Sequence, residues 1–247
     1  MYQFNRIFKM DLINLATNPM WIFYSTGFPL LLILIIGFLT SGSYGTEVTA
    51  YDYYGITMMI FTVLYSATIS ANSFMEERIK SGNMRIIHSP VPPFFLYFSK
   101  ILASFVFTTI CYTFAGIVLM MTVHVNFGGP NTAFVWGLLV LLNFFSCTLG
   151  VLLCCALKSE STTNQLLSML ITLLAVLGGL FFPLDGLGKA IEMISYLSPV
   201  KWISTAIFQL IYDQKDVLLA PTAVILTGLS ALMILLSMRL FKREDYL

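Results

Sequence analysis

Charged side chains are scarce in this chain. Only 10% of its 247 residues are Asp, Glu, Lys or Arg, whereas 58% are hydrophobic. Soluble domains carry about 25% charged residues, so this composition excludes a soluble protein and predicts an integral membrane protein. The net charge is +1, and without a basic face we expect no nucleic-acid partner. The length suits several spans and no second soluble domain, which predicts one transmembrane domain over residues 1–247.

Metal ligands, disulfides and a phosphate-binding loop are also missing. The two histidines have no acid or cysteine at ligand spacing, so we expect no metal site. The four cysteines lie inside apolar runs and are interpreted as small packing residues. The one Gly-Lys pair, Gly188-Lys189, has Pro183 where a phosphate-binding motif needs its first glycine and Ala190 where it needs a hydroxyl. We therefore expect no cofactor and no catalytic residue in this chain.

What the sequence does contain is long apolar runs. Stretches without Asp, Glu, Lys, Arg or His cover residues 20–40, 54–75, 101–123, 132–157, 162–182 and 217–238, with the third span expected over 99–123. Each can cross a hydrocarbon core of about 30 Å as a helix. Backbone groups find no water in lipid, so these runs predict an all-α membrane protein with six transmembrane helices. The absence of charge inside them argues against ion-coupled transport through internal carboxylates.

Lysine and arginine predict the orientation of the spans. Ten of the 13 flank one set of span ends and three flank the other. By the positive-inside rule both termini are expected in the cytoplasm. We expect a multi-pass protein of a bacterial cell membrane, in contact with lipids. At the start of the chain, Phe4, Phe8, Leu12 and Leu15 recur at helical spacing, which predicts an interfacial helix over residues 1–19.

A long apolar segment, residues 183–216, connects the fifth and sixth expected spans on the outer side. Pro183, Gly186 and Gly188 mark a break, and Ser198 followed by Pro199 is a helix-start signal. The candidate residues of this external segment are Phe182, Pro183, Ser198 and Pro199. The segment therefore predicts short helices that re-enter the outer leaflet.

Small and hydroxyl side chains form rows on two of the expected spans. The second span carries Thr62, Ser66 and Ser70, and the fifth carries Gln165, Ser168, Thr172 and Gly179. Such rows are ordinary material for helix packing in membranes. Two rows of similar character also suit a shared polar cavity, a substrate path or a dimer seam, and the sequence leaves these alternatives open.

The segment between the second and third expected spans, residues 76–93, is the most charged part of the chain. It begins with Glu76-Glu77-Arg78 and ends in prolines that halt a helix before the third span. Between them, Ser81 can cap a two-turn helix with Met84 and Ile87 on one apolar face. We call residues 76–93 the coupling segment, because a short amphipathic helix at the tip of a membrane loop suits docking into a groove on a soluble partner.

These features resemble the membrane subunits of type-two ATP-binding-cassette (ABC) exporters. A span ending in Glu-Glu-Arg is followed by "SGNMRIIHSPVPP" and "FFLYFSKILASF", and "GGLFFPLDGLGKAIEMISYLSPVKWISTAI" is similar to the family's fifth span and external segment. The likeness covers essentially the whole chain. The family often has Glu-Arg-Glu followed by Gly-Thr, whereas here Glu76-Glu77-Arg78 leads into Ile79-Lys80-Ser81-Gly82.

The resemblance implies a subunit that pairs with a second copy or a paralogue and docks separate cytoplasmic ABC ATPase subunits, on which ATP and Mg²⁺ bind. It implies docking through Glu76, Glu77, Arg78, Ser81, Gly82, Met84, Arg85, Ile87 and Pro90. The subunit is then no enzyme by itself, and its expected cargo is an amphiphile such as an antibiotic, a peptide or a lipid-like molecule. The alternative is an ATP-independent channel, or a scaffold or immunity protein.

Overall fold

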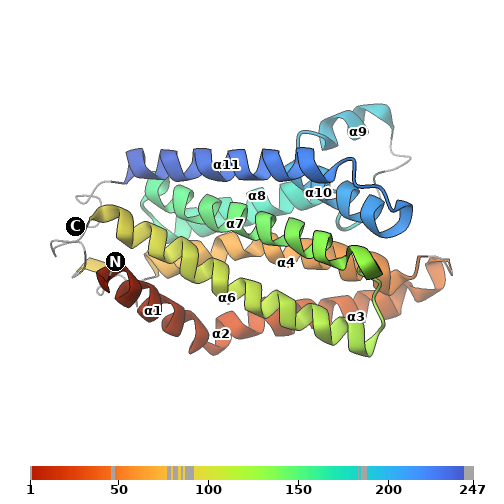
Figure 1. Cartoon of the computed structure of the whole chain (residues 1–247), viewed down its shortest axis with the longest axis horizontal. Helices are drawn as coiled ribbons and strands as arrows, with labels where there is room; N and C mark the ends of the chain where they lie inside the picture. The colour runs from red at the N-terminus through yellow and green to blue at the C-terminus, as the bar shows by residue number, and fades with distance from the viewer. Residues whose placement is uncertain are drawn as a thin grey trace.

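The computed structural model describes residues 2–45, 48–76, 79, 83, 84, 86, 92–182, 184 and 188–241. Within them every regular element is helical, which confirms the all-α expectation. The α-helices are α1 (Tyr2–Ala16), α2 (Pro19–Ile22), α3 (Phe28–Thr40), α4 (Ala50–Met75), α6 (Pro93–Thr122), α7 (Thr132–Leu157), α8 (Glu160–Leu177), α9 (Lys189–Ser195), α10 (Pro199–Phe208) and α11 (Leu219–Leu240). Figure 1 shows the long helices side by side, with α1 and the last turns of α11 at one end and α9 and α10 at the other.

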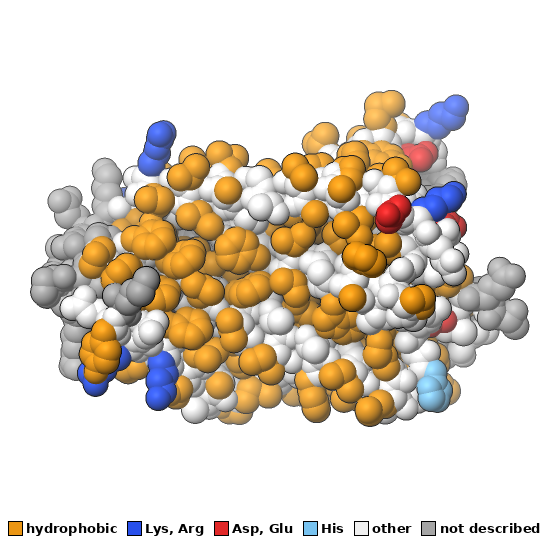
Figure 2. Space-filling view, in the orientation of Figure 1, with side chains coloured by type: hydrophobic (Ala, Val, Ile, Leu, Met, Phe, Trp, Pro, Cys, Tyr) orange, Lys and Arg blue, Asp and Glu red, His pale blue; other side chains and the backbone are white. Residues whose placement is uncertain are grey.

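Five helical stretches among the described residues are long and apolar enough to cross a membrane. They are Pro19–Thr40, Ala50–Met75, Phe94–Thr122, Gly129–Leu157 and Leu219–Leu240. The fifth expected span, 162–182, overlaps α8, whose 18 residues begin with the polar sequence ESTTNQ and are not among the five. A count of six spans therefore stays a prediction. On the face in Figure 2, hydrophobic side chains cover the middle of the bundle and charged side chains gather toward its ends.

Two of these helices extend beyond the apolar runs and include a charged residue. α4 begins at Ala50 because Thr49 and Asp52 form a capping box, in which the backbone N–H of each donates to the other's side chain, at 3.2 and 3.1 Å. α6 begins at Pro93 and contains Lys100. Asp52 and Lys100 are both buried. An apolar run stops at the first charge, whereas each of these helices continues through it and includes a buried charged residue near one end.

α4 is the central helix of the bundle. In its most apolar stretch 83% of residues are buried, and it contacts α3, α6, α7 and α8. Its closest approach to α7 depends on Gly150, where an added Cβ would lie 2.0 Å from the carbonyl oxygen of Ala67. Small residues of this kind let helix backbones pack closely in membranes. Because α4 ends at Met75, the coupling segment continues directly from the most enclosed helix.

Candidate coupling site

Asn83 attaches the coupling segment to the end of α4. Its side chain is 1% exposed, and its Nδ2 donates to the carbonyl oxygen of Phe74 at 2.9 Å. The last carbonyl groups of a helix have no partner within the helix, and this bond supplies a donor to one of them. Sequence reasoning missed Asn83, because its partner lies nine residues earlier, beyond the roughly two to four residues over which asparagine side chains make their usual local backbone contacts.

Two of the predicted docking residues are described by the structure. Met84 is half-buried and packs against the main hydrophobic core, as does its neighbour Ile86. Glu76 is half-buried at the C-terminal end of α4, where its backbone N–H donates to Asn72 at 2.9 Å. The other predicted docking residues lie outside the described residues; they are Glu77, Arg78, Ser81, Gly82, Arg85, Ile87 and Pro90.

The helix at the start of the chain, α1, packs on α6. The ring of Phe4 lies 5.5 Å from that of Phe95 and 6.0 Å from that of Phe98. Farther along, Leu15 is 1% exposed and belongs to a small hydrophobic cluster with residues of α4 and α6. The apolar row expected to face lipid thus contacts protein, because the beginning of α6 offers an aromatic surface of its own.

A buried ion pair joins α1 to α6. The Lys100 ammonium and the Ser99 hydroxyl both donate to the carboxylate of Asp11. Asp11 is 4% exposed and Lys100 1%. The sequence signal was weak, because Lys100 reads as a marker of the cytoplasmic side and Asp11 as one polar residue of an amphipathic helix. Only packing shows that the two charges are enclosed together.

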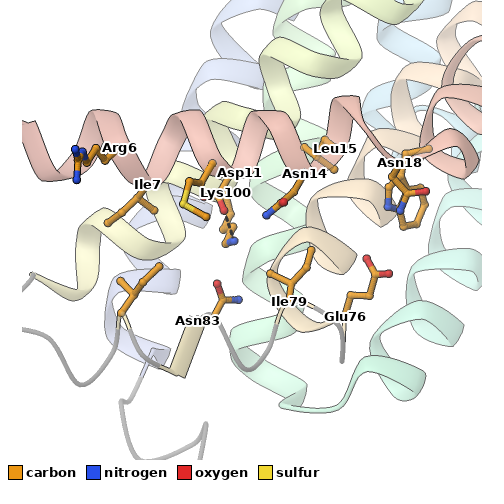
Figure 3. Close-up of a pocket in the computed structure, with 13 residues that line it drawn as sticks. Arg6, Ile7, Asp11, Asn14, Leu15, Asn18, Glu76, Ile79, Asn83 and Lys100 are labelled. Atoms are coloured by element: carbon orange, nitrogen blue, oxygen red, sulfur yellow. Dashed lines mark hydrogen bonds and ion pairs between the residues drawn. The ribbon is translucent and has the colours of Figure 1, made fainter.

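A cleft of about 460 Å³ lies between α1, the end of α4 and the coupling segment (Figure 3). α1 forms one wall, along which Arg6 and Asn14 lie, and Glu76, Ile79 and Asn83 lie opposite. The Asp11–Lys100 pair also lines the cleft. The coupling segment therefore has a cleft beside it. If the segment moves toward α1, it meets fewer packed side chains there than it would inside the bundle.

A pair of asparagines connects α4 to α8. Asn72 Nδ2 donates to Asn164 Oδ1 at 3.1 Å, and Asn164 Nδ2 donates to Asn72 Oδ1 at 3.0 Å. Asn72 is 6% exposed. This reciprocal pair lies one turn before the end of α4, so it joins the helix that leads into the coupling segment to its neighbour.

The two predicted polar rows do not share one surface. On α4, Ser66 donates to Val63 O and Ser70 to Cys147 O of α7, and both are fully buried within this chain. Thr62 is half-buried and lines a smaller cavity of about 290 Å³ against α3. On α8, by contrast, the side chains are exposed in the isolated chain; they are Gln165, Ser168 and Thr172. Gly179 follows α8 with φ +70°, and its carbonyl accepts from Tyr53 at 2.8 Å.

Of the predicted external residues, Ser198 lies where α10 meets α8. Ser198 Oγ accepts from the backbone of Val200 at 3.3 Å and donates to Leu174 O of α8 at 3.2 Å. Pro199 occupies the first turn of α10. Phe182 is 45% exposed, and Pro183 lies outside the described residues.

The fold and this site together define a class, a multi-pass helical membrane protein. Across the described residues no group of three or more His, Cys, Asp or Glu lies together to hold a metal. A sequence model of the ABC-2 type transporter family matches residues 2–212, and the chain belongs to that family. It is a membrane component of an ABC-2 transporter. No curated protein matches the chain by sequence.

Proposed function

We propose that the chain is the membrane-spanning subunit of an ATP-driven exporter, powered by separate cytoplasmic ATPase subunits that dock on the coupling segment. ATP and Mg²⁺ bind on those subunits and not on this chain. The observation that carries the proposal is the bond from Asn83 to Phe74 O, because it ties the segment to the last turn of the central helix. A push on the segment is then a push on α4.

Force applied there has a defined route through the bundle. α4 packs tightly on α7 at Gly150, so it moves as a rigid rod and not by local bending. The Asn72–Asn164 pair passes the displacement to α8. In this proposal α8 meets a second copy or a paralogue of the chain, and tilting it opens or closes the seam between them.

The cargo in this proposal is amphiphilic, such as an antibiotic, a peptide or a lipid-like molecule. The exposed face of α8 supports it, since Ser168 and Thr172 lie on that face beside Met169, Leu173 and Val176. Such a face offers hydroxyl groups beside apolar area, which suits molecules with one polar end. We propose both termini and the coupling segment in the cytoplasm, six spans in all, and a bacterial cell membrane.

Coexpression with ATPase subunits encoded beside the gene tests this function. Copurification reports docking, and ATP turnover in nanodiscs reports coupling. Replacing Glu77 and Arg78 by alanine should abolish copurification. Asn83→Leu should retain the ATPase but lose most of the change in turnover that the membrane subunit imposes, because the segment is no longer held to Phe74.

A matched control is Asn5→Leu, which makes the same replacement at an exposed asparagine of α1 at the same end of the bundle. It should behave like the unaltered chain. If no ATPase copurifies and the chain alone still protects cells or conducts solute, the ATP-independent channel or immunity function is correct instead. If Asn83→Leu couples normally, force does not pass through this bond.

A further inference from the structure

Another cavity, of about 470 Å³, lies at the end of the bundle opposite the coupling segment. The start of α4, the residues after α8, the helices α9 and α10, and the π-helical turn Gln209–Asp213 all contribute to its lining. We call it the distal cavity. Elements distant in sequence converge on it, so its walls are set by the tertiary fold and not by one loop.

One wall of the distal cavity is aromatic. The ring of Phe208 stacks on Tyr53 at 5.6 Å and on Tyr212 at 6.1 Å, with interplanar angles of 24° and 16°. The Tyr53 hydroxyl already has a hydrogen-bond partner, because it donates to Gly179 O. The Tyr212 hydroxyl is buried and has no hydrogen-bond partner among the described residues. Burial, and after it the Asp52 carboxylate, raise the pKa of Tyr212 to about 12, so this hydroxyl stays neutral at physiological pH.

The polar side chains of the distal cavity are biased toward negative charge. Its described lining includes two carboxylates, Glu192 and Asp213, and one ammonium, Lys201. None of the three makes an ion pair with another described residue. The carboxylates are exposed and therefore available to a ligand. A cleft lined with an excess of one sign concentrates ligands of the opposite sign.

We propose that the distal cavity binds amphiphilic organic cations, molecules with an ammonium or similar centre on an apolar body. Aromatic rings attract such cations and give their apolar parts a surface to pack on, while the carboxylates complement the charge. An anion of the same shape meets the same apolar surface and an excess of negative charge. If the chain exports its cargo as proposed above, the consequence is that the cargo is cationic and leaves through this cavity. This consequence, unlike the binding itself, rests on the proposed function.

A pair of ions with nearly the same shape tests the inference. Tetraphenylphosphonium and tetraphenylborate differ in the sign of their charge, and their binding to the full chain in nanodiscs is measured by equilibrium dialysis, with empty nanodiscs subtracted. We expect the cation to bind more tightly than the anion by about tenfold or more. The combined variant Glu192→Gln, Asp213→Asn should remove that preference. Tyr212→Leu should lower the binding affinity for the cation several-fold.

Asp216→Asn is the matched control, since Asp216 is an exposed carboxylate three residues beyond Asp213 and outside the cavity lining. It should leave binding unchanged. Equal binding of both ions, or full cation affinity in the combined variant, would overturn the proposal. The assay contains neither ATPase nor ATP, so a loss of coupling in the earlier experiment and a loss of binding here are separate results.

Discussion

The ion pair between Asp11 and Lys100 gives the most demanding test of how α1 is held. Lys100→Met removes the ammonium and leaves the Asp11 carboxylate, 4% exposed, with the Ser99 hydroxyl as its one remaining donor among the described contacts. Removing one partner of a buried pair costs about 3–5 kcal/mol. Total stabilities are about 5–15 kcal/mol, so this is a large share of what holds the chain folded.

The loss of stability should appear first as detachment of α1 from α6, because detachment exposes the unpaired Asp11 carboxylate to water. The apolar contacts of α1 oppose detachment, and Leu15 alone contributes about 1.5–3 kcal/mol by its burial. We therefore expect a partly detached helix and a lower free energy of unfolding, measured in mixed micelles. Protease cleavage within residues 2–16 should rise in parallel.

A double-mutant cycle separates the pair from the positions it occupies. The double variant Asp11→Leu, Lys100→Met replaces two enclosed charges by apolar groups of similar size, and such replacements are often neutral or stabilising. The double variant should recover most of the free energy of unfolding that Lys100→Met loses. Lys9→Met, at an exposed lysine of the same helix, should change the free energy of unfolding by less than about 0.5 kcal/mol. If the double variant costs the sum of the two single changes, the two charges do not interact and the reasoning is refuted.

Two further variants probe the contacts around α4. Gly150→Ala should destabilise the bundle by about 1–3 kcal/mol, because its Cβ would meet the backbone of Ala67. Gly137→Ala on the same helix has open space around its Cβ and should be neutral or slightly stabilising. Equal effects of the two variants on thermal unfolding would contradict the close approach of α4 and α7. Asn164→Leu should cost about 1–3 kcal/mol, because it removes the donor to Asn72 Oδ1 while Asn72 Nδ2 keeps its bond to Thr68 O, and replacing both asparagines by leucine should recover part of that cost. No recovery in the double variant would show that the pair is not a unit.

Hydropathy determined much of the architecture. In lipid, the backbone N–H and C=O groups of a run such as 132–157 must form hydrogen bonds with one another, which makes the run helical. The structure has α7 over Thr132–Leu157. The Ser198-Pro199 signal lies at the start of α10 for an equally local reason, since a cap acts within its own turn. The family follows from patterns of the same local kind, spread over most of the chain.

The candidate site depended on contacts that no local pattern records. Asn83 is an unremarkable polar residue in the sequence, and its partner Phe74 O lies nine residues earlier. Asn72 and Asn164 are 92 residues apart. Equally, Ser66 and Thr172 look alike as members of polar rows, yet one is enclosed against α7 and the other is exposed. Periodicity identifies a helical face but not the neighbour that covers it.

By itself, then, the sequence determined that this chain is a set of apolar helices with a charged segment between two of them, because the solvent dictates those properties residue by residue. Only the tertiary structure decided which charges are enclosed together, which polar rows are covered, and that α4 is the central helix from which the coupling segment continues. These depend on the side-by-side placement of helices. Packing energy sets that placement over the whole bundle and not within any one run.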